Sequence, residues 1–254
     1  MKGRIIVSTL LALLLLVSMP MSALAATWDI SKGDITVNAE SGGQTVRQGG
    51  GAAVPDSAPV ITGTSKENNV TINADSGQTA SVTLSGVNID VRDKGKAAVS
   101  TTGEGNVNIE LNGSNALKSG HSHAGLEKNN DGNLTIQDKD KDGSLNAKGG
   151  QDGAGIGGGY ESGAGNIEIT GGTVEAVGGE GAAGIGGGVY GPGRDIEISG
   201  GKVSASGGSY SGDPRPGAAG IGDGAGAWSE IDPDAPLSNP NHIIISGDAE
   251  VEAK

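Results

Sequence analysis

Hydrophobic residues in the second half of the chain alternate with polar or glycine residues at a spacing of two. Ile167 with Ile169, and Val174 with Ala176, follow this rule. A period of two is typical of β-strands, because successive side chains point to opposite faces, whereas a helix needs a period near 3.6. The pattern therefore predicts short strands that each bury two side chains on one face.

These strands belong to a repeat. Two kinds of segment, one rich in glycine and one strand-like, each occur three times. The glycine-rich segments are 153–159, 183–188 and 219–224, and the strand-like segments are 166–176, 195–205 and 242–253. Successive copies of the first kind place Ile156 and Ile185 29 residues apart. A period near thirty residues indicates a solenoid, in which each turn buries its apolar face against the next.

The repeat predicts an all-β fold, a right-handed parallel β-helix with three short strands per turn and roughly seven turns. Stacking the turns lines Ile167 with Ile196 and Ile243 in an internal ladder. The same stacking places Glu168 over Glu197 on the outside, at one strand spacing. Glycine and asparagine between the strands supply the conformations that tight corners need.

The chain divides into three predicted regions. Residues 1–25 combine a basic start, an apolar run and small residues at 23–25, which is the pattern of a secretory signal peptide. Residues 26–60 are expected to form an N-terminal strand pair or cap, and residues 61–254 the solenoid. Strand residues continue to the end at Lys254, so we expect further domains or a partner that stacks end-on against the last turn. A secreted protein with no membrane insertion after cleavage is the expectation.

Composition supports a narrow interior. Gly 49 and Pro 9 make up about 23% of the chain, and aromatic residues only 2%. Leu, Ile and Val make up about 17% of residues 26–254, which is too little for an ordinary core. A solenoid needs few aliphatic residues, because each turn encloses only a thin core. The absence of Cys excludes disulfides and thiolate metal sites.

The net charge limits the partners. It is −13 for the whole chain and −15 after Lys2 and Arg4 leave with the leader. An acidic protein is repelled by nucleic acid phosphates and by anionic lipid surfaces, so no nucleic acid partner is expected. Divalent cations are attracted by the same charge.

Glycines alternate with the inward aliphatic residues of the glycine-rich segments, so we expect one outer face to be bare backbone. Aromatic residues follow this strip on successive turns. A flat surface flanked by aromatic rings predicts polysaccharide binding by stacking on sugar faces. The alternative is that the rings fold back over the glycines as lids. The candidate ligand-binding residues are Gly155, Gly157, Gly184, Gly186, Tyr160, Tyr190 and Trp228.

A calcium loop is a second candidate. Asp138, Asp140 and Asp142 occupy ligand positions one, three and five, and Gly143 stands where the loop must bend. The twelfth position is Gly149 in place of the bidentate Glu, so the site needs completion from another turn. The alternative is an acidic turn between two strands.

No catalytic residue is assigned. Glu168 and Glu197 form a carboxylate pair such as glycosidases use, but neighbouring exposed positions on a regular face are usually only solvated. The segment 121–123 holds two histidines without a third metal ligand, and is expected to be a surface loop. Arg194 and Arg215, considered as bases of a lyase, lack an acidic cluster.

Residues 81–205 carry a resemblance to a known group. The segments SVTLSGVNIDV, GSNALKSGHSHAGLEKNNDGNLTI, DGSLNAKGGQDGAGIGGG and NIEITGGTVEAVGG, in this order, resemble the glycine-rich, secreted β-helix surface proteins of Gram-positive bacteria. Relatives of that group include carbohydrate-binding domains that are similar in fold to pectate lyases, some with calcium sites. The resemblance implies a non-catalytic, extracellular or cell-surface module that binds polysaccharide or cell-wall glycan, with calcium as a cofactor. A structural spacer or adhesin segment of a larger surface protein, and a polysaccharide lyase or hydrolase, remain alternatives.

Overall fold

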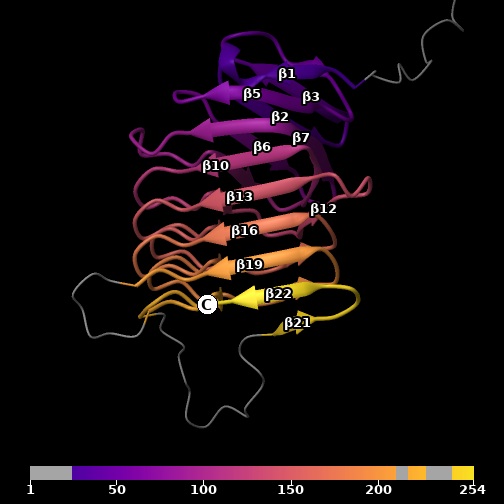
Figure 1. Ribbon diagram of the computed structural model, residues 1–254. Helices are drawn as coiled ribbons and strands as arrows, with labels where there is room; N and C mark the ends of the chain where they lie inside the picture. The colour runs from indigo at the N-terminus through magenta and orange to yellow at the C-terminus, as the bar shows by residue number, and fades with distance from the viewer. Residues whose placement is uncertain (1–24, 210–216, 227–241) are drawn as a thin grey trace, which may run out of the picture.

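The computed structural model describes residues 25–209, 217–226 and 242–254. They wind into a right-handed parallel β-helix whose turns stack from the indigo N-terminal end to the yellow C-terminal end (Figure 1). The predicted fold class is confirmed. Six complete turns run from β5 to β20, and β21 and β22 begin another. Most of the predicted leader, 1–25, lies outside the described residues, as do Trp228 and Arg215.

Three ladders of parallel strands form the walls. The first consists of β1 (Thr27–Asp29), β5 (Val60–Ser65), β7 (Thr79–Asp90), β9 (Asn106–Asn112), β12 (Leu134–Gln137), β15 (Ile167–Ile169), β18 (Ile196–Ile198) and β21 (Ile243–Ile245). The second continues from the end of β7 through β10 (Ser114–Lys118), β13 (Ser144–Lys148), β16 (Thr173–Val177), β19 (Lys202–Ser206) and β22 (Glu250–Ala253). The third contains β2 (Ile35–Glu40), β6 (Val70–Ala74), β8 (Val99–Thr102), β11 (Leu126–Lys128), β14 (Ile156–Gly157), β17 (Ile185–Gly186) and β20 (Ile221–Gly222).

The ladders begin within the segment 26–60. Strand β1 already pairs in parallel with β5, and β2 with β6. A short 3-10 turn, η1 (Ile30–Lys32), connects β1 to β2. Strand β3 (Gly43–Gln48) then pairs antiparallel with β2, and β4 (Val54–Pro55) with β3. This addition covers the free edge of β2, which would otherwise offer unpaired backbone groups to another strand.

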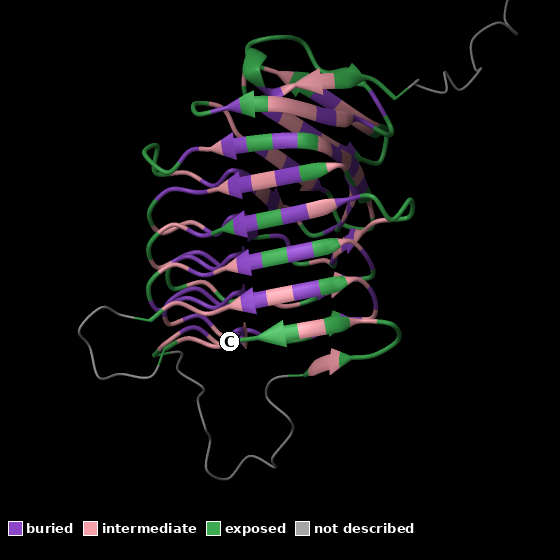
Figure 2. Ribbon diagram, in the orientation of Figure 1, coloured by how far each residue is buried: buried purple, intermediate pink, exposed green. Residues whose placement is uncertain are grey.

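The internal isoleucine ladder is confirmed. Ile167 pairs with Ile196, and Ile196 with Ile243. Ile196 is fully buried, whereas Ile243 on the last described turn is only half-buried. Buried positions alternate with more exposed ones along most strands of the first two ladders (Figure 2), whereas β11, β14 and β17 of the third ladder are buried throughout. Burying an isoleucine contributes about 2 kcal/mol, so even two inward side chains per strand sum to a stable core over several turns.

The described residues contain no α-helix, and none of their segments is a helix long and apolar enough to span a bilayer.

Candidate functional site

Tyr160 and Tyr190 lie side by side on adjacent turns, as the repeat predicts. Their ring centroids are 6.0 Å apart and the rings meet edge to face, at 76°. The side chain of Tyr190 packs over Gly226, where an added Cβ would lie 2.7 Å from Cε1 of the ring. Tyr160 remains 42% exposed. One ring therefore covers a glycine of the next turn that lies outside the predicted strip, while the other presents an open surface.

Tyr190 is held in a backbone conformation that disfavours its side chain. Its φ is +63°, in the left-handed region. The N–H of Glu161 donates to the Val189 carbonyl and that of Tyr190 to the Ala225 carbonyl, so Glu161 and Tyr190 occupy the same corner of successive turns. Glycine is the default residue at such a corner, and a bulky side chain there costs about 1–2 kcal/mol. Local strain of this kind is concentrated at functional sites.

Polar side chains surround the two rings. The neighbouring Glu161 carboxylate raises the pKa of Tyr160 above its ordinary value, chiefly by hydrogen bonding to the protonated phenol. Asp152 adds to the negative potential there, and its Oδ2 lies 3.7 Å from His121 Nε2. We call Tyr160, Tyr190, Glu161, Asp152 and His121 the aromatic corner. It combines an exposed ring with hydrogen-bonding groups and a net negative charge.

The expected bare glycine face is wrong. Gly155, Gly157, Gly184 and Gly186 are all buried. A Cβ on Gly155 would lie 2.5 Å from the backbone N of Val177 in the next turn, and one on Gly157 would lie 2.0 Å from the Gly186 carbonyl oxygen. The glycines are present because the backbones of successive turns approach too closely for any side chain. They cannot contact a ligand at the surface.

The acidic loop is organised by its own backbone. One carboxylate oxygen of Asp138 accepts the N–H of Asp142 at 3.3 Å, and the other accepts the N–H of Gly143 at 2.9 Å. Among the residues that the structure describes, no three Asp, Glu or His side chains converge where they could hold a metal ion. Asp138, Asp140 and Asp142 thus do not form a preassembled site, and calcium binding there stays a prediction.

Glu110 of the preceding turn anchors the same loop. Its Oε1 accepts the backbone N–H of Lys139 at 2.7 Å, and its Oε2 lies 3.6 Å from Lys139 Nζ. The Glu110 carboxylate, the nearest one from another turn, is therefore already in contact with Lys139.

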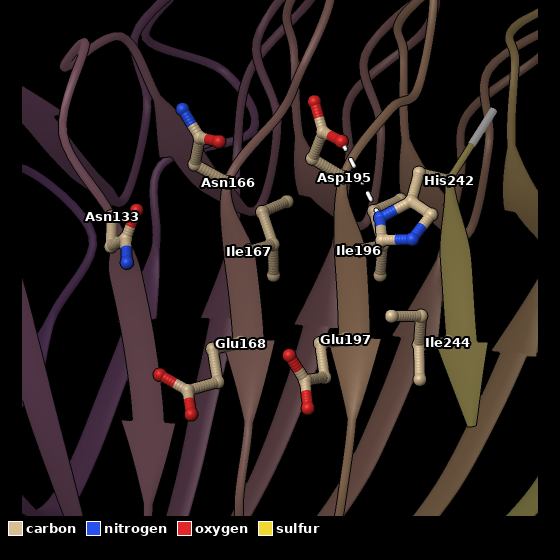
Figure 3. Close-up of a pocket in the computed structure, with 9 residues that line it drawn as sticks. All are labelled: Asn133, Asn166, Ile167, Glu168, Asp195, Ile196, Glu197, His242 and Ile244. Carbon is tan, nitrogen blue, oxygen red and sulfur yellow. Dashed lines mark ion pairs between the residues drawn. The ribbon is translucent and has the colours of Figure 1, made fainter. Parts of the chain in front are cut away.

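An acidic recess of about 280 Å³ lies on the outer face of the first ladder. Figure 3 shows Glu168 and Glu197 projecting side by side from β15 and β18, with the side chains of Asp195 and His242 beyond them. His242 Nδ1 lies 3.7 Å from Asp195 Oδ1. The predicted stacking of Glu168 on Glu197 is confirmed, and both side chains lie at the surface of the recess.

One turn contains buried polar residues that sequence reasoning missed. Glu127 and Lys128 of β11 are 7% and 6% exposed. Lys128 Nζ donates to the Asn130 carbonyl at 2.6 Å, and burial lowers the pKa of Lys128 to about 8. Glu127 pairs in register with Gly157, which pairs with Gly186. An alignment of the repeats could have revealed Glu127, because the three following turns have glycine at the same position.

Comparison with known proteins supports the architecture. A family model described as "Beta helix repeat" matches residues 141–160, 167–189 and 196–225. No curated protein and no solved structure shows a significant match to this chain. The repeat match describes a solenoid that is compatible with a surface or binding module, and it does not decide whether the protein has a catalytic activity.

Proposed function

We propose that this protein is a secreted, non-catalytic module that binds a polysaccharide at the aromatic corner. The observation that supports this most is the strained Tyr190, which brings its ring against the exposed Tyr160 in a chain with only 2% aromatic residues. An amphipathic ring beside hydrogen-bonding groups suits a sugar, whose ring has apolar faces and polar edges. The predicted leader and the resemblance to secreted bacterial surface proteins agree with an extracellular role.

The charge of the corner narrows the ligand class. Asp152 and Glu161 flank the rings, and Glu180 lies close by, with Oε2 3.5 Å from Gln151 Nε2. An anionic polysaccharide would be repelled by these carboxylates and by the acidic chain as a whole. We therefore propose a neutral glycan.

Pull-down on insoluble cellulose, chitin and calcium pectate, with and without chelator, tests the proposal. We expect retention on at least one neutral polymer and weak retention on pectate. Tyr160→Ala is expected to weaken retention about 10-fold, because the exposed ring is lost. Val54→Ala is the matched control, since it removes an exposed apolar side chain, 48% accessible, from β4 at the other end of the solenoid. Equal retention of Tyr160→Ala and the wild type, or no retention on any polymer, contradicts the proposal.

A second candidate is a structural spacer or adhesin segment, and the regular stacking of six turns favours it. It predicts no glycan retention and identical behaviour of the tyrosine variants and the wild type.

A further inference from the structure

Glu127 carries a long charged side chain at a position where the preceding turn has a serine and the following turns have glycine. On one side it pairs with Ser100 and on the other with Gly157, which in turn pairs with Gly186. A buried carboxylate is unfavourable unless it is paired and hydrogen-bonded, so this residue weakens the fold unless its contacts compensate. A buried carboxylate that destabilises the fold suggests that the residues it contacts have a function.

The Glu127 carboxylate is fully used by its neighbours. Oε2 accepts the backbone N–H of Ala124 at 3.0 Å and lies 2.8 Å from His123 Nδ1, and Oε1 accepts Asn129 Nδ2 at 2.9 Å. A carboxylate only accepts hydrogen bonds, so the proton on the His123 ring lies on Nδ1. In the neutral imidazole Nε2 is then an acceptor, with a fixed direction.

His123 lies next to the aromatic corner. The backbone N–H of Tyr160 donates to the Ser122 carbonyl at 2.9 Å. An added Cβ on Gly159, the residue before Tyr160, would lie 3.1 Å from Glu127 Oε2. The His123 side chain is 33% exposed, and among the described residues Nε2 has no hydrogen-bond partner. A positioned acceptor therefore reaches the surface in the turn directly next to that of Tyr160.

We propose that His123 is a ligand-binding residue of the aromatic corner, which accepts through Nε2 a hydrogen bond from a glycan hydroxyl. Glu127 is its positioning residue, because it fixes the tautomer and the ring orientation. This inference rests on the proposed function and extends the site by a specific polar contact. It favours sugars with a free hydroxyl at the edge of the ring that stacks on Tyr160.

The tautomer is measured first, without any ligand, by ¹⁵N NMR of histidine-labelled protein at neutral pH. The chain has 3 histidines, so His121→Asn, His123→Asn and His242→Asn assign the signals. We expect the Nδ1–H form for His123, and a mixture of tautomers in Glu127→Gln. A wild-type His123 with its proton on Nε2, or an imidazolium, overturns the positioning argument.

Binding is measured second, by depletion isotherms on cellulose and chitin. His123→Asn keeps a side-chain N–H for Glu127 and removes Nε2 together with the outer part of the ring, so we expect nearly normal thermal stability and about 5- to 10-fold weaker binding. His242→Asn, which changes a histidine on the distant β21 side of the solenoid, is the control and should bind normally. Unchanged binding of His123→Asn, with weak binding of Tyr160→Ala, overturns this inference alone. Failure of the wild type to bind either polymer overturns both the inference and the proposed function.

Discussion

Glu168 and Glu197 are direct neighbours in the β15–β18 ladder, and their carboxylates project from the same face of the sheet (Figure 3). Thr135 Oγ1 donates a hydrogen bond to Glu168 Oε2 at 3.1 Å, so one oxygen of the Glu168 carboxylate has a partner. Like charges at directly paired positions repel each other and destabilise the sheet by a few tenths of a kcal/mol or more.

Glu197→Gln should therefore raise the melting temperature by about 1–2 °C at low salt, since it removes the repulsion and keeps the size of the side chain. The gain should shrink in high salt, where exposed charges are screened. Thermal unfolding followed by circular dichroism measures both effects. Glu175→Gln is the control, because Glu175 pairs with Ser204 and accepts a hydrogen bond from Asn146 Nδ2. A salt-independent gain, or the same gain in the control, contradicts this interpretation.

The buried glycines of the third ladder lead to a second prediction. A Cβ on Gly184 would lie 2.5 Å from Ser206 N and 2.6 Å from the Gly220 carbonyl oxygen, which are both backbone atoms. Gly184→Ala should thus destabilise the protein by about 1–3 kcal/mol, because the turns must separate to admit the methyl group. Gly42→Ala, at a site with no atom within 4 Å of the added Cβ, should have little effect. Chemical denaturation measures the free energy of unfolding of both variants. Equal values for Gly184→Ala and Gly42→Ala would contradict the close backbone packing around Gly184.

Lys128 gives a pH-dependent prediction. Burial lowers its pKa from 10.5 to about 8, so the folded protein binds fewer protons than the unfolded chain between these pH values. Below pH 8 the buried Lys128 ammonium lowers the free energy of unfolding by its full amount. As the pH rises toward 10.5, the folded protein loses this charge and the free energy of unfolding increases. Lys128→Met should therefore stabilise the protein at pH 7 by on the order of 1–3 kcal/mol and lose this advantage above pH 10.

Urea unfolding at several pH values checks the Lys128 prediction. Lys148→Met, at an exposed position of β13, is the matched control and should show no such recovery. A constant difference between Lys128→Met and the wild type at all pH values would show that desolvation of the ammonium is not the cause.

The repeat carried enough information to predict the fold. The period of two at Ile167 and Ile169 and the 29-residue spacing together specify which side chains stack, and the register of β15 and β18 agrees residue by residue. Solenoids are predictable in this way because each turn contacts only its neighbours, so the long-range pairings follow from the period.

The candidate site was harder to predict. The alternation rule placed Gly155 and Gly184 outward, but the rule describes side-chain direction in an extended strand and does not reveal how closely the next backbone approaches. The role of Glu127 could not be predicted from the sequence either, because its hydrogen bonds with Ala124 and Asn129 depend on the exact path of the backbone at the corner. Adjacency of Tyr160 and Tyr190, in contrast, followed from the turn length alone.

The most direct test of the central claim is the binding isotherm of Tyr190→Asn on cellulose and chitin. Asn adopts the left-handed conformation readily, so it relieves the strain at φ +63° while it removes the ring. The lost ring contact with Tyr160 is worth about 0.5–1.5 kcal/mol, which offsets the relieved strain and leaves the melting temperature nearly unchanged. We predict a dissociation constant at least about 10-fold higher than that of the wild type. A variant that melts normally and binds with unchanged affinity would contradict the account.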